Sequence, residues 1–106
     1  DCLTSWEKIQ KRLSSAAIGD FVIALYNPRS QERNWQLKEA LDILQDHRSL
    51  ETPVVLARQV GRPEEKISLS TLGSLEIKEV DMLTLILVGN SSSFVKDDKM
   101  ITPRGY

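Results

Sequence analysis

Three short apolar runs, separated by amphipathic segments, constrain the fold of this chain more than any other feature of its sequence. The runs cover residues 21–26, 54–57 and 84–88. A continuous apolar run like the first is typical of a strand that is buried on both faces of a sheet. Asn27 and Pro28 end the first run, Pro53 opens the second, and Gly89 closes the third, as expected for strand boundaries. The runs therefore predict a sheet with buried strands.

Two amphipathic segments flank the first of these strands. One begins with a capping box at Thr4 and Glu7 and stops near Gly19, and the other extends from about Gln31 to His47. At its helix C-terminus, His47 is expected to complement the helix dipole rather than to act in catalysis. Both segments have apolar residues at helical spacing: Trp6, Ile9, Leu13 and Ala16 in the first, and Leu37, Ala40, Leu41 and Leu44 in the second.

The remaining segments complete an α/β pattern. Residues 66–70 alternate polar and apolar side chains, and they follow the second strand too closely for a helical crossover, so we expect an antiparallel strand there. Residues 71–80 are expected to form a short helix or an irregular turn, and residues 94–101 a last hairpin. Strands that alternate with helices predict an α/β fold. We expect one domain, residues 1–106, built as a three-layer α/β/α sandwich on a mixed sheet.

The composition argues against several classes of protein. Hydrophobic residues make up 41% and charged residues 27% of the 106 residues, as in a globular domain. The net charge of −1 gives no general attraction to nucleic acid or to an anionic membrane. The single cysteine, Cys2, excludes an intramolecular disulfide, and no metal-ligand spacing is present. We expect a cytoplasmic protein. The start at Asp1 is typical of a processed product or of an excised piece of a longer protein, and we favour the second.

Polar loops follow three of the expected strands. The segment YNPRS, residues 26–30, lies between a strand and a helix, where ligands bind in open α/β sheets. Gly61 and the segment GNS, residues 89–91, follow the other two strands. If these strands are parallel, the three loops form a single cleft. Each loop also has a simpler interpretation as a turn, since Asn, Pro and Gly are common turn residues.

Several of these segments together resemble the tetrapyrrole methylase family, and within it the C-terminal half of the branch that methylates carbon 17 of precorrin-3B. The most specific are FVIALYNPRS (residues 21–30) and MITPRGY (residues 100–106), and the order is preserved over nearly the whole chain. The resemblance implies an S-adenosylmethionine-dependent methyltransferase of cobalamin biosynthesis with two α/β domains. The cofactor lies between the domains, and the enzymes usually act as homodimers. The glycine-rich loop of the N-terminal domain is absent from this sequence, so we expect a fragment that is inactive alone.

The resemblance also implies contacts to the cofactor from two loops. Tyr26 lines the adenosyl pocket after the first strand, with Asn27 as its neighbour. Val60 and Gly61 belong to the loop whose backbone approaches the adenine. Val60 replaces the small residue that the family has more often, which implies a looser contact.

The C-terminal tail and two arginines complete the implied site. Thr102 and Pro103 match the tail that closes over the nucleoside. Arg29 and Arg104 are candidates for the carboxylates of the corrin-precursor substrate. No acid or base for ring contraction is assigned in this half.

A second hypothesis stays open beside the methyltransferase. The chain would then be a non-catalytic α/β interaction or regulatory module that keeps the fold and binds no cofactor. A module that had lost the ligand would have little physical reason to keep three loops together, which favours the first hypothesis; these loops are YNPRS (residues 26–30), GN (residues 89–90) and TPRGY (residues 102–106).

Overall fold

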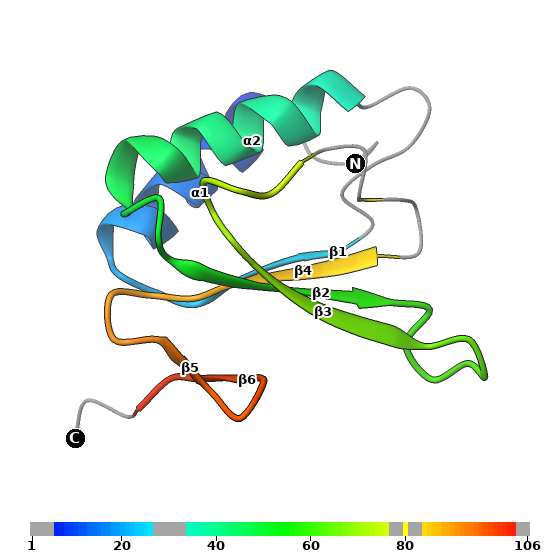
Figure 1. Ribbon diagram of the computed structural model, residues 1–106. Helices are drawn as coiled ribbons and strands as arrows, with labels where there is room; N and C mark the ends of the chain where they lie inside the picture. Colours follow the sequence, from blue (N-terminus) through cyan, green and yellow to red (C-terminus); the bar gives the residue numbers. More distant parts are fainter. Residues whose placement is uncertain (1–5, 27–33, 77–79, 81–83, 104–106) are drawn as a thin grey trace.

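The computed structural model describes residues 6–26, 34–76, 80 and 84–103 (Figure 1). Within that part of the chain, no helix is long and apolar enough to cross a membrane. The expected order of helices and strands is confirmed. The elements are α1 (Trp6–Ile18), β1 (Ile23–Tyr26), α2 (Asn34–His47), β2 (Pro53–Arg58), β3 (Lys66–Thr71), β4 (Thr84–Val88), β5 (Phe94–Lys96) and β6 (Lys99–Ile101).

The main sheet has the strand order β1-β4-β2-β3, and each neighbouring pair is antiparallel. The antiparallel pairing of β3 with β2 confirms the expectation for residues 66–70. The expected mixed sheet is wrong for the described strands. β4 lies between β1 and β2 and runs against both, so β1 and β2, which share a direction, do not pair with each other.

Both described helices form one layer over the same face of this sheet (Figure 1). Helix α2 connects β1 to β2, which run in the same direction, and such crossovers have a fixed hand that places the helix on one side. The β5–β6 hairpin lies on the other side of the sheet (Figure 1). The expected three-layer sandwich is therefore not found in the described residues, where one helical layer covers one face.

The single helical layer explains which strand residues are buried. Along β4, Thr84, Ile86 and Val88 are buried, whereas the alternate residues Leu85 and Leu87 are partly exposed. Phe21 and Val22 were expected in the first strand, but they precede β1 and are exposed. The expectation of a first strand buried on both faces is wrong, because β1 is an edge strand and has helices on one side only.

The core fills the space between the two helices and the sheet. The apolar faces expected for both helices are confirmed, and they meet the inward-facing residues of β2 and β4. Leu44, Leu56 and Ile86 have no exposed surface at all. The cluster consists of Leu13, Ala17, Ile23, Leu37, Ala40, Leu41, Leu44, Val54, Leu56, Leu72, Leu75, Val80, Ile86 and Val88.

Helix α1 ends at Ile18, directly before Gly19 as the sequence indicates, but the left-handed residue of its C-cap lies one position later. The left-handed residue is Asp20, with a φ of 62°, and not Gly19. The N–H of Phe21 donates to the carbonyl of Ala16, and that of Asp20 donates to Ala17. This is the Schellman arrangement, in which the last helical carbonyls are satisfied by the turn that follows. Aspartate tolerates this conformation better than most residues.

The expected terminal hairpin is confirmed as β5 and β6, which pair antiparallel. Its two loop residues, Asp97 and Asp98, have φ values of 52° and 60°. Two consecutive positive φ angles are characteristic of a type I′ turn, whose twist matches that of the strands.

Residues 71–80 were expected to form either a short helix or an irregular turn. The described residues of this segment after β3 form a turn, so the second alternative is correct there.

Candidate functional site

The strand directions decide which loops share an edge of the sheet. Tyr26 ends β1 opposite Leu85, and Arg58 ends β2 opposite Thr84. We call this side the carboxyl edge; it comprises Tyr26, residues 58–61 and Thr84. It brings together the expected cofactor residues Tyr26, Val60 and Gly61.

The loop after β2 is built from two tight turns. The N–H of Arg62 donates to the carbonyl of Gln59 at 3.0 Å, and that of Glu65 donates to Arg62 at 3.0 Å. Gly61 has a φ of 81°, and this value at the third position of a turn defines type II. A Cβ added to Gly61 would have no atom within 4 Å, and the side chain of Val60 is 58% exposed. The loop is thus open to solvent on this side.

Other expected site residues lie elsewhere. The loop of residues 89–91 follows β4, which runs against β1 and β2, so it lies at the opposite edge and not in a common cleft. Thr102 lies there too, since its hydroxyl and that of Ser93 share a hydrogen bond of 2.6 Å. The six residues of β2 span five steps of about 3.3 Å, so β2 separates the two edges by roughly 17 Å. Asn27, Arg29 and Arg104 lie outside the described residues.

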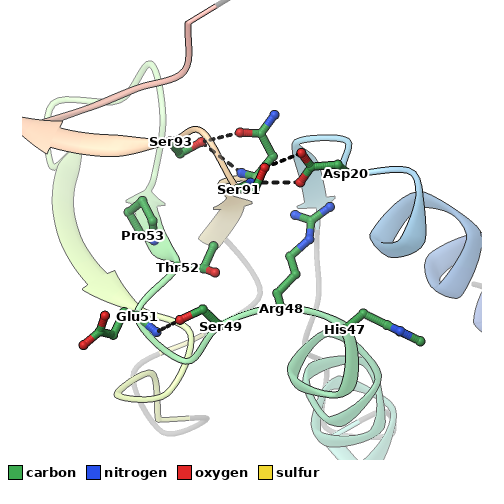
Figure 2. A pocket seen from close by; sticks show the side chains of 10 residues that line it. Asp20, His47, Arg48, Ser49, Glu51, Thr52, Pro53, Ser91 and Ser93 are labelled. Carbon is green, nitrogen blue, oxygen red and sulfur yellow. Dashed lines mark hydrogen bonds between the residues drawn. The ribbon is translucent and has the colours of Figure 1, made fainter. Parts of the chain in front are cut away.

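The opposite edge holds a polar depression of about 400 Å³ (Figure 2). Of its walls, only the loop of residues 89–91 was expected from the sequence to face a ligand. The lining residues are Asp20, His47, Arg48, Ser49, Glu51, Thr52, Pro53, Asn90, Ser91 and Ser93.

Arg48, which no sequence pattern indicated as a site residue, connects three segments at this edge. One guanidinium nitrogen donates to the carbonyl of Gly89 at 2.6 Å. The other donates to the carbonyls of Ala16 and Phe21. Burial lowers the pKa of the Arg48 guanidinium, and the nearby Asp20 carboxylate acts against this shift. Arginine keeps its charge in such surroundings, so the guanidinium remains a donor to all three carbonyls. We call the Arg48 side chain the carbonyl clamp.

Asp20 completes this network (Figure 2). Its carboxylate accepts hydrogen bonds from the backbone N–H of Ser91, at 2.8 Å, and from the Ser91 hydroxyl. These hydrogen bonds, the hydroxyl first, lower the pKa of Asp20, and the charge of Arg48 adds to them. The carboxylate thereby joins the end of α1 to the loop after β4. Its position directly after Gly19 at a helix stop is the one sequence signal for it.

The contacts of Asp20 with Ser91 and Arg48 predict how its carboxyl group titrates. Its folded pKa lies below the ordinary value, so its contribution to stability is present above the unfolded pKa and is lost as the pH falls through the folded pKa. Replacing Ser91 with Ala removes the hydroxyl donor, and we expect the pKa of Asp20 to rise toward its ordinary value. Carbon-13 NMR titration of the side-chain carboxyl measures this shift, and Ser92→Ala is the control. An unchanged pKa in Ser91→Ala would contradict the assignment.

His47 lies at the C-terminal end of α2, as expected. Its imidazole points away from the other labelled side chains of the depression (Figure 2). This position agrees with a role at the helix terminus and gives no support to catalysis. Among the described residues, no group of three or more His, Cys, Asp or Glu side chains gathers as a metal site does.

The sequence of the chain matches one protein family over most of its length. A sequence model of the family described as Tetrapyrrole (Corrin/Porphyrin) Methylases matches residues 1–76. The chain belongs to this family.

Individual tetrapyrrole methylases are similar over the full chain. The probable cobalt-factor III C(17)-methyltransferase of Salmonella typhimurium is 46% identical over 106 residues, which are 100% of this chain and 44% of that protein. The precorrin-3B C(17)-methyltransferase of a Sinorhizobium species is 40% identical over 111 residues, again 100% and 44%. The chain is homologous to these enzymes and spans less than half of their length.

Solved structures agree with this relationship. The crystal structure of the methyltransferase CobJ superimposes with a TM-score of 0.91 at 38% identity, over 97% of this chain and 43% of that one. The cobalt precorrin-4 methyltransferase CbiF gives a TM-score of 0.56 at 23% identity, over 73% of this chain, and that likeness concerns the fold alone.

Proposed function

We propose that this chain is the C-terminal part of an S-adenosylmethionine-dependent methyltransferase that acts on carbon 17 of precorrin-3B or cobalt-factor III in cobalamin biosynthesis. The observation that carries the proposal is the 46% identity to the Salmonella enzyme along the entire chain, and the TM-score of 0.91 to CobJ supports it. The rest of the parent chain supplies the other domain, with a homodimer as the working unit in the cytoplasm.

The cofactor's adenosyl group is assigned in this proposal to the carboxyl edge. The open space beside Gly61 and the exposed side chain of Val60 fit the approach of a flat base. Tyr26 is brought to the same edge by β1, and Asn27 follows it in the sequence. Thr84, at the beginning of β4, is the third segment at this edge.

Thr102 has a different role in this proposal. Its hydroxyl bond to Ser93 joins the residue after β6 to the loop before β5, so we assign it to fixing the hairpin at the opposite edge. Pro103 follows it there. Arg29 and Arg104 remain candidates for the substrate carboxylates, on the basis of their charge alone.

The chemistry assigned to this half is binding and orientation. S-Adenosylmethionine supplies an activated methyl group when it is bound. The carboxyl edge would hold the adenosyl end in one position, which is the main protein contribution to a direct displacement. None of the described residues need form a covalent bond to the substrate.

A chimera tests the proposal. The segment of the Salmonella enzyme that matches this chain is replaced by residues 1–106, and S-adenosylhomocysteine is titrated into the product by calorimetry. We expect micromolar binding, about −8 kcal/mol, and methyl transfer to cobalt-factor III. The 106-residue chain alone is the control and should give no transfer. A folded chimera that neither binds nor transfers would contradict the proposal and leave the non-catalytic module.

A further inference from the structure

The loop after β2 holds one peptide bond in a fixed orientation. The N–H of Gly61 donates to the Glu65 carboxylate at 2.8 Å. This bond closes the two consecutive turns of the loop onto each other. Because the C=O and N–H of one trans peptide point in opposite directions, the Val60 carbonyl of the same peptide faces away from Glu65.

The Val60 carbonyl is left available by this arrangement. No hydrogen bond of the described residues uses it as an acceptor. The loop is exposed, and the space beside Gly61 is open. The peptide therefore offers an acceptor to the outside, while its donor is already occupied by the protein.

We propose that Glu65 is a positioning residue that sets the hydrogen-bonding polarity of the carboxyl edge. With the Gly61 N–H held by Glu65, the edge presents a carbonyl, and its matching ligand group is a donor such as the 6-amino group of adenine. An oxo group at the same ring position would meet the carbonyl as a second acceptor. This inference rests on the proposed function, because it takes the adenosyl group to lie at this edge.

The turn type also supports one fixed orientation of the peptide between Val60 and Gly61. The type II turn at Val60 and Gly61 differs from a type I turn by a flip of this central peptide. Glycine at the third position permits both forms, so the backbone alone does not choose between them. The Glu65 carboxylate stabilises the form in which the Val60 carbonyl faces outward.

The test uses three variants of the chimera. Glu65→Ala removes the acceptor and frees the peptide to flip, and we expect S-adenosylhomocysteine to bind about fivefold more weakly, as for the loss of one modest hydrogen bond. Glu65→Gln keeps an amide oxygen that can accept from Gly61, and its affinity should stay within about twofold of the unchanged chimera. Glu64→Ala, at the exposed neighbour, is the matched control. Thermal melting confirms that each variant is folded.

The preference for one base over another distinguishes a positioning role of Glu65 from a general loosening of the loop. S-Inosylhomocysteine carries an oxo group in place of the 6-amino group of the adenine ligand. We expect the unchanged chimera to prefer the adenine ligand by about tenfold or more, and Glu65→Ala to narrow that ratio to about two- or threefold. A ratio that is the same in all variants would overturn the role of Glu65. Failure of the unchanged chimera to bind either ligand would instead overturn the proposed function.

Discussion

Arg48→Met is expected to lower the free energy of unfolding of the 106-residue chain by roughly 3 kcal/mol. The substitution keeps an unbranched apolar stem and removes all donors to the carbonyls of Ala16, Phe21 and Gly89. A hydrogen bond from a charged group contributes about 1.5–3 kcal/mol. Three such bonds give less than their simple sum, because the side chain is only partly buried. The end of α1, the residues before β1 and the end of β4 would all lose their common partner.

Urea unfolding followed by circular dichroism measures this loss. The midpoint should fall while the m-value stays the same, as expected when stability changes without a change in the surface exposed on unfolding. Arg48→Lys is the matched variant, since it keeps the charge but replaces the planar fork with a compact ammonium, and it should give an intermediate loss. A midpoint for Arg48→Met equal to that of the unchanged chain would contradict the carbonyl-clamp role.

Leu56→Ala is expected to cost about 3–4 kcal/mol, within the range for leucine to alanine in a packed core. Leu56 has no exposed surface and pairs with Ile86 in the row of β2 and β4 that faces the helices. Truncation leaves a cavity between the sheet and the helices that rigid strands cannot close. The same urea experiment measures the effect.

Ile67→Ala provides the matched control for the core substitution. Ile67 lies on β3 and is 61% exposed, so its truncation removes little buried surface, and we expect a loss of less than about 1 kcal/mol. Comparable losses for both variants would mean that the core is not where the structure places it.

The local sequence predicted the two strand ends that meet at the carboxyl edge. The segment YNPRS and Gly61 follow strands that the apolar runs mark clearly, and the structure brings the ends of both strands to one edge. Grouping the residues 89–91 with them failed, because the direction of β4 is set by its pairing with two strands distant in the sequence. Nothing in the residues 84–88 themselves encodes that direction.

The sequence by itself determined the helices, the strands, the terminal hairpin and the α/β class. These follow from side-chain periodicity, from proline and glycine breaks and from local turn preferences, all of which act within a few residues. Only the tertiary structure decided the insertion of β4 between β1 and β2, the single helical layer and the network of Arg48 with Asp20 and Ser91. Those features depend on contacts between residues far apart in the chain, such as Asp20 and Ser91, which local patterns do not contain.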